Sequence, residues 1–124
     1  MSPKSSNQST GKVGERLSEA YLKKQGYEIV ARNVRSPFGE IDLVAKHKKT
    51  LVFVEVKTRR GTDFGLPEEA VTKRKKVRLG RLASWYLTQC PGSDLPVRFD
   101  VLAIQLEGNN PDIRLIQDAF ELSS

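Results

Sequence analysis

Two apolar segments that carry acidic residues constrain this fold more than any other feature of the sequence. They lie within residues 39–59, which read GEIDLVAKHKKTLVFVEVKTR. Residues 40–45 and 51–57 have the apolar content of strands, and the polar residues 46–50 between them suit a short hairpin connection. The stretch therefore predicts two neighbouring antiparallel strands.

Strand periodicity decides which side chains of this hairpin share a face. Side chains alternate between the two faces of a strand, so Glu40 and Asp42 share one face. The residues expected on the opposite face of that strand are Ile41, Leu43 and Ala45. On the second strand, Glu55 and Lys57 share a face. We expect the antiparallel pairing to bring Asp42, Glu55 and Lys57 together at one end of a sheet.

Such a cluster of two carboxylates and an ammonium has a specific chemistry. Neighbouring carboxylates repel one another, and burying one without a counter-charge is costly or shifts its pKa. Mg²⁺ prefers carboxylate oxygens and lowers the pKa of a bound water, and Lys57 would orient that water or offset charge on phosphorus. The alternative is that Glu55 and Lys57 are solvent-facing residues of a half-exposed strand, which VEVK alone would favour. The spacing of Asp42 from Glu55 and Lys57, with Glu40 beside it, favours the metal site.

The whole-chain composition limits the other options. The 124 residues suit one domain, and the net charge of +6 favours an acidic partner. A single cysteine, Cys90, excludes an internal disulfide, and a single histidine, His47, argues against zinc or histidine chemistry. Residues 1–10 lack the apolar core of a secretory signal, and no apolar run reaches the roughly 20 residues of a membrane helix. We expect a cytoplasmic protein that does not act at a membrane.

The first part of the chain predicts a tail, a helix and a strand. Residues 1–10 are too polar to bury, so we expect a disordered tail followed by a single domain over residues 11–124. Residues 11–25 carry an apolar stripe at helical spacing, and residues 27–33 alternate as a strand. Glu15 lies in the first turn of that helix, where interaction with the helix dipole is the simplest role for its charge.

Basic residues dominate the segment that follows the hairpin. A second helix is predicted to begin near Pro67 and to end before Pro91, with Trp85 and Tyr86 packed on the core rather than stacked on bases. A charge run is often only a solvated helix face, but this one follows the acidic strands directly, which favours contact with phosphates. The residues expected to bind nucleic acid are Arg35, Arg59, Arg60, Lys73, Arg74, Lys75, Lys76 and Arg78, with Arg81 on the same helix.

The last part of the chain predicts a covered strand and an edge strand. Residues 97–106 are apolar on both faces, and residues 113–116 are predicted to form a short edge strand. Asp100 is an alternative metal ligand, although pairing with Arg98 or capping a turn is the simpler role.

Taken together, these motifs resemble the PD-(D/E)XK nuclease superfamily, and within it the YraN family of small bacterial proteins. The resemblance covers almost everything after Thr10 and is most specific in GEID and VFVEVKTR. The matching positions are Gly14 and Glu15, residues 31–33, Arg35, residues 39–43, residues 52–59, residues 64–65, residues 70–71, Lys75, residues 98–101 and residues 119–120.

The resemblance implies an α/β fold, a restriction-endonuclease-like mixed sheet of α-β-β-β-α-β order with flanking helices. It also implies that Glu15, Asp42, Glu55 and Lys57 match positions that archaeal Holliday-junction resolvases use for metal binding and catalysis. Where many relatives have a histidine before the closing Ala-Phe, this chain has Leu115, so a catalytic role of the tail is not implied.

The leading hypothesis is a nuclease, dependent on Mg²⁺ or Mn²⁺, that acts on DNA and includes branched or structured DNA among its substrates. Asp42 and Glu55 would hold the metal, Glu15 and Glu40 would support it, and Lys57 would assist the attacking water. A symmetric homodimer would be required to cut two strands of a junction. The alternatives are a nucleic-acid-binding module of a repair or recombination complex that does not cut, and a structural protein whose acids pair internally with Arg35 or Arg59.

Overall fold

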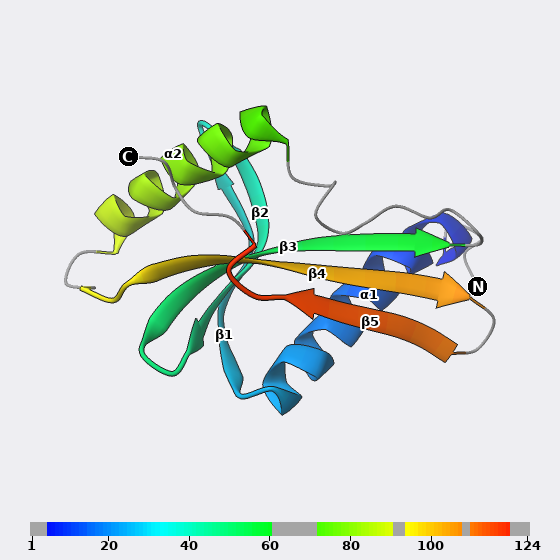
Figure 1. Ribbon diagram of the computed structural model, residues 1–124. Coiled ribbons are helices and arrows are strands. Elements are labelled where there is room, and N and C mark those ends of the chain that lie inside the picture. Colours follow the sequence, from blue (N-terminus) through cyan, green and yellow to red (C-terminus); the bar gives the residue numbers. More distant parts are fainter. Residues whose placement is uncertain (1–4, 61–71, 91–93, 108–109, 120–124) are drawn as a thin grey trace.

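A twisted five-stranded sheet lies between two helices in the computed structural model, which describes residues 5–60, 72–90, 94–107 and 110–119 (Figure 1). The elements in chain order are α1 (Ser5–Lys24), β1 (Tyr27–Ser36), β2 (Gly39–His47), β3 (Thr50–Arg60), α2 (Lys73–Gln89), β4 (Val97–Glu107) and β5 (Asn110–Ile116). The strands are ordered β1-β2-β3-β4-β5; β3 and β4 are parallel, and the other neighbours are antiparallel. The predicted mixed α/β sheet with flanking helices is confirmed.

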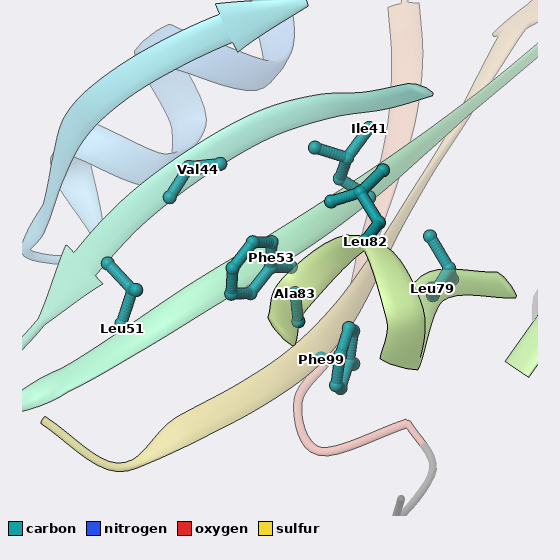
Figure 2. Packing of buried hydrophobic residues seen from close by; sticks show 8 residues of the cluster. All are labelled: Ile41, Val44, Leu51, Phe53, Leu79, Leu82, Ala83 and Phe99. Carbon is teal, nitrogen blue, oxygen red and sulfur yellow. The ribbon is translucent and has the colours of Figure 1, made fainter. Parts of the chain in front are cut away.

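Two hydrophobic clusters, one on each face of the sheet, hold the helices in place. On one face Phe53 of β3 and Phe99 of β4 pack with Leu79, Leu82 and Ala83 of α2 (Figure 2). The cluster on the other face consists of Leu22 of α1 and the strand residues Tyr27, Leu43, Ala45, Val52, Val54, Leu102 and Ile104. The apolar face predicted for the second helix is therefore confirmed, and β3 is covered on both faces.

The start of α1 differs from the predicted helix. α1 begins at Ser5, so residues 5–10 of the expected tail are helical and residues 1–4 lie outside the described part. The helix crosses β3 very closely at Gly14. A Cβ atom at this position would lie 2.2 Å from Oγ1 of Thr58 and 3.2 Å from its Cβ. Only glycine lets α1 approach the end of β3 this closely.

α2 is capped by a side chain. Thr72 is its N-cap, and the Thr72 hydroxyl accepts a hydrogen bond from the backbone N–H of Lys75 at 3.2 Å. The predicted start at Pro67 lies outside the described residues, as do the matched positions 64–65, 70–71 and 120 and the side chain of Arg60.

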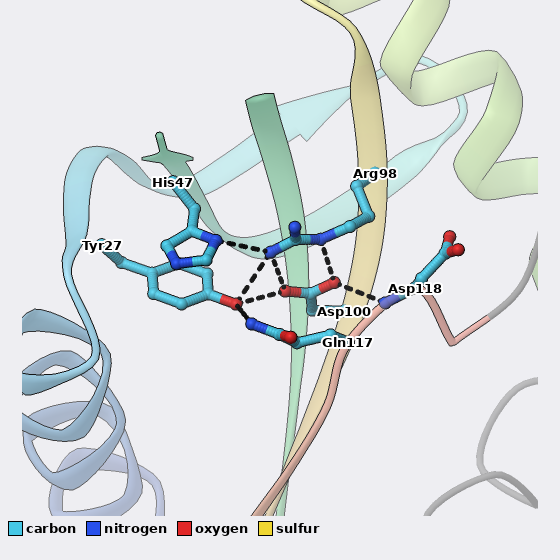
Figure 3. Close-up of polar contacts among 6 residues, drawn as sticks. All are labelled: Tyr27, His47, Arg98, Asp100, Gln117 and Asp118. Carbon is cyan, nitrogen blue, oxygen red and sulfur yellow. Dashed lines mark hydrogen bonds and ion pairs between the residues drawn. The ribbon is translucent and has the colours of Figure 1, made fainter. Parts of the chain in front are cut away.

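A polar network around the buried Asp100 links β4 to β1 and to the segment that follows β5 (Figure 3). Asp100 accepts hydrogen bonds from Tyr27 Oη at 2.7 Å and from Arg98 Nε at 2.9 Å. The backbone N–H of Asp118, just after β5, donates to the same carboxylate at 2.9 Å. Asp100 is thus paired with Arg98, the simpler of the two roles that the sequence allowed.

Neither helix in the described part has the length and apolar character needed to span a membrane.

Candidate active site

Asp42 lies where the regular strand pattern of β1 and β2 breaks. Ile41 packs on the α2 face with Val44, whereas Leu43 packs on the α1 face. The expectation that Ile41, Leu43 and Ala45 share a face is therefore wrong for Ile41. The alternation fails at Asp42, and the pairs between β2 and β3 end at Leu43 with Val54.

The break has a backbone cause on the neighbouring strand. Arg32 pairs with Leu43 and Val34 pairs with Ile41, so Asn33 lies opposite Asp42. Asn33 has a φ of 49°, in the left-handed region that asparagine tolerates better than most residues. Left-handed backbone inside a strand interrupts its pleat, and such backbone is often found at functional sites.

The irregular backbone gives the Asp42 side chain a partner in β3. Oδ2 of Asp42 accepts a hydrogen bond from the backbone N–H of Val56 at 2.7 Å, in place of a regular ladder bond. The carboxylate is thereby fixed between β2 and β3 and half-buried. Its position is set by the fold rather than by a flexible loop.

Glu15 reaches the same region from α1. It follows Gly14, whose close contact with Thr58 fixes the height of the helix over β3. Oε2 of Glu15 accepts a hydrogen bond from Nδ2 of Asn33 at 3.2 Å. The residue whose backbone interrupts β1 therefore also orients the helix carboxylate.

Glu55 comes from β3 and is paired with a cation of α2. Its Oε2 forms a close ion pair with Nζ of Lys75, and the two side chains are only 14% and 16% exposed. Lys75 lies in the first turn of α2, after the Thr72 cap. The sequence predicted Lys75 as a phosphate contact, whereas the structure gives it a carboxylate partner in the site.

The three carboxylates act on one another electrostatically. Burial raises the pKa of Asp42, and the negative charges of Glu55 and Glu15 raise it further. The Val56 N–H and the Lys75 ammonium act in the opposite direction. Three acidic side chains from α1, β2 and β3 therefore share one region in which an additional positive charge would be stabilising.

The donor set fits a hard divalent cation by its chemistry, since it consists of carboxylate oxygens alone. Asp42 keeps one oxygen that accepts no bond from Val56, and Glu55 is balanced by Lys75. In the arrangement described, however, no group of three or more His, Cys, Asp or Glu side chains is close enough to hold one ion. Within the described residues, Asp42 and Glu55 are the pair that would hold a metal, and Glu15 would contribute only its charge.

Lys57 and Glu40, the two remaining predicted site residues, have different surroundings. Lys57 lies two positions after Glu55 and by strand alternation faces the same side, away from Thr58 and α1. Glu40 instead forms an exposed ion pair with Arg35 across β1 and β2, at 2.8 Å. Glu40 is not among the charges that act on Asp42.

The predicted nucleic-acid contacts fall into two groups. Arg59 lies on β3, on the face of Glu55 by strand alternation. On α2 the exposed basic side chains are Lys73, Arg74, Lys76, Arg78 and Arg81. These five side chains, on a helix that contains no acidic residue, make up the cationic surface of α2.

Asn33 and Gly14 are the residues whose roles sequence reasoning missed. The left-handed asparagine could have been suspected from its place inside an alternating segment, since asparagine is depleted in strands. The close approach at Gly14 has no local signal, because it depends on how α1 crosses β3.

Comparison with known proteins gives a consistent family result. The family model described as "Uncharacterised protein family UPF0102" matches residues 14–104. A UPF0102 protein of Syntrophotalea carbinolica is 44% identical over 92% of this chain and 93% of its own length. Those of Desulfosudis oleivorans and Symbiobacterium thermophilum are 46% and 50% identical, over 92% and 89% of this chain and 91% and 94% of their own lengths.

Proposed function

The chain belongs to the uncharacterised protein family UPF0102, and because this membership names no activity, we propose from the site itself that the protein is a metal-dependent nuclease acting on DNA. The observation that supports the proposal is that the half-buried Asp42 of β2 experiences the negative charges of both Glu55 of β3 and Glu15 of α1. The pKa of Asp42 is raised by burial and by the charges of the other two. Keeping repelling carboxylates together costs stability, and such costs are typical of sites built for a cation.

Each residue would have a definite task. Asp42 and Glu55 would hold Mg²⁺ or Mn²⁺, and Glu15, fixed by Asn33, would add negative charge around it. When bound, the metal would supply a water of lowered pKa and a contact to a phosphodiester oxygen. Lys57, two residues from Glu55 on the same strand, would offset the negative charge that develops on phosphorus.

The cationic surface of α2 would place the backbone of the substrate. Lys73, Arg74, Lys76 and Arg81 are exposed on the helix whose first turn contacts Glu55 through Lys75. Phosphate groups bound along this helix would therefore lie next to the carboxylates. Branched or structured DNA is the finer form of the proposal, and it rests on the resemblance to resolvases.

A binding module that does not cut is the second candidate, and a specific observation favours it. Lys75 already neutralises Glu55, and the described residues hold no ready group of three metal ligands. A protein with this arrangement would bind nucleic acid through α2 while its carboxylates contribute to the fold only.

Cleavage of defined DNAs in Mg²⁺ or Mn²⁺ tests the proposal. Single-stranded, duplex, flap and four-way-junction DNAs would be incubated with the wild type and with Asp42→Ala and Glu55→Ala. Asp112→Ala, which removes an exposed carboxylate on β5, is the matched control. We expect cleavage by the wild type and the control, and none by the two site variants. Binding without cleavage in all four proteins would favour the second candidate.

A further inference from the structure

A hollow lies on the outer face of α2, outside the carboxylate site. It has a volume of about 680 Å³ and lies between the turn that precedes β2 and the middle of the helix. A second hollow of about 480 Å³ adjoins it and shares Phe38, Val77 and Arg81. The residues that line the two are Phe38, Arg74, Lys76, Val77, Arg78, Gly80, Arg81, Ser84, Trp85 and Thr88.

The turn between β1 and β2 can lie close against α2 because the residue that follows it, Gly39, has no side chain. Gly39 has a φ of +127°, and a Cβ atom there would lie 2.9 Å from Cδ of Arg78. This contact sets the turn beside the helix and places Phe38 in the hollow with Val77 and Trp85. The hollow is thus formed between a turn and a helix that approach one another closely.

Apolar groups remain exposed in the hollow. Phe38 and Val77 are 38% and 54% exposed, and Trp85 is half-buried. Tyr86 packs its ring edge-on against Phe53, as the sequence predicted. Trp85 differs from the expectation, because its side chain lines the surface hollow and is not part of the buried clusters.

Positive charge surrounds this apolar floor. Arg74, Lys76, Arg78 and Arg81 line the two hollows, and none of the described residues that line them is acidic. An apolar groove alone would suit many partners, but four cations around it select a polyanion. Nucleobases joined by phosphates combine flat apolar rings with regular negative charge, and in a duplex those ring faces are covered by stacking.

We propose that this hollow binds unpaired bases of single-stranded DNA, with Phe38 and Trp85 stacking on the bases and the surrounding arginines contacting the phosphates. The inference deepens the proposed function and rests on it. Lys76, at one end of the hollow, belongs to the same first turn of α2 as Lys75, which contacts Glu55, so the hollow and the carboxylates lie on different sides of this turn. A strand bound in the hollow that continues around the first turn of α2 would bring its phosphate backbone to the candidate active site, and this would favour substrates that contain single-stranded segments.

The chain supplies its own reporter, because Trp85 is the only tryptophan. Fluorescence of the full chain would be titrated with a thymidine oligonucleotide, an abasic oligonucleotide of the same length and a duplex. Stacking on Trp85 should quench the emission, so we expect quenching by the thymidine strand only. The abasic strand carries the same phosphates, and it should bind through charge without quenching.

Variants then separate the ring contact from general charge. Phe38→Leu keeps an apolar side chain but removes the ring, and it should weaken binding of the thymidine strand at least about fivefold and leave duplex binding unchanged. Val30→Ala alters an exposed apolar residue of β1 that does not line the hollow, and it should change neither. Arg81→Gln should weaken binding of all three DNAs and reduce its salt dependence.

The outcomes distinguish the two proposals. Equal quenching by abasic and thymidine strands, or unchanged binding in Phe38→Leu, would overturn the base-stacking inference and leave the nuclease proposal intact. Tighter binding of poly-glutamate than of either strand would also overturn it, in favour of an acidic protein partner. A wild type that binds none of the DNAs would overturn both proposals.

Discussion

Asp100 provides the sharpest test of how this fold is stabilised. Its side chain is fully buried and accepts hydrogen bonds from Tyr27, from Nε and Nη2 of Arg98, and from the backbone of Asp118. Asp100→Ala would remove the carboxylate and leave a mostly buried guanidinium, a phenol and a backbone N–H without their acceptor. Breaking a buried ion pair by removing one partner costs about 3–5 kcal/mol.

The partial exposure of Arg98 indicates where in this range the cost of Asp100→Ala should lie. Arg98 is 20% exposed, so water can reach part of the guanidinium, and we expect the lower end of that range, about 3 kcal/mol. A domain of this kind has about 5–15 kcal/mol of total stability, so the variant should fold but be clearly weakened. Arg98 also contacts Nδ1 of His47 at 3.2 Å, which couples β4 to the end of β2.

The adjacent strand offers a matched control. Asp112 and Arg114 on β5 are also an aspartate and an arginine two residues apart, but both are exposed. Nε of Arg114 lies 3.8 Å from Oδ2 of Asp112. Asp112→Ala should change the free energy of unfolding by less than about 0.5 kcal/mol. Urea unfolding followed by circular dichroism measures both values, with an unchanged m-value as the check on compactness. A loss below about 1 kcal/mol for Asp100→Ala would refute the reasoning that the network stabilises the fold.

Two further predictions concern pH. Burial, followed by the charges of Glu55 and Glu15, raises the pKa of Asp42, so its stabilising contribution is present below the unfolded pKa and is lost as the pH rises through the folded value. Asp42→Asn should therefore unfold at a higher urea concentration than the wild type at pH 7 and should lose this advantage near pH 3. Mg²⁺ should not stabilise the variant. Unfolding of the variant at a lower urea concentration than the wild type at pH 7 would contradict this reasoning. Burial and the hydrogen bond to Asp100 raise the pKa of Tyr27 to about 12, so stability present below pH ~10 should fall between pH ~10 and ~12. Tyr27→Phe should show a smaller decline over that interval in urea unfolding, and an identical decline would count against the assignment.

Local patterns were sufficient to predict the main elements. Alternation identified the β2–β3 hairpin and the acidic residues on it, and helical spacing identified the buried face of α2 with Leu79 and Leu82. Both signals report whether a position faces the core, which is a property of each element by itself.

The details of the site depend on contacts between elements, and these have no local signal. The left-handed Asn33 changes the face of Ile41, so a strict two-residue period assigns that side chain wrongly. The Lys75–Glu55 pair joins residues on α2 and β3, and nothing near either residue in the sequence specifies it. Trp85 was expected to pack on the core, yet its side chain lines a surface hollow together with Phe38.

The two helices affect the site in opposite ways. α1 adds negative charge, because Gly14 brings it close to β3 and Glu15 then faces Asn33 and the region of Asp42. α2 adds positive charge through Lys75, which takes the role of counter-ion to Glu55. One ammonium carries a single positive charge, so it cannot neutralise both the Glu55 carboxylate and a phosphate that it contacts. Under the proposed function, phosphate contact by Lys75 would leave Glu55 in need of another cation. The chain would then hold a divalent ion most tightly when nucleic acid lies along α2.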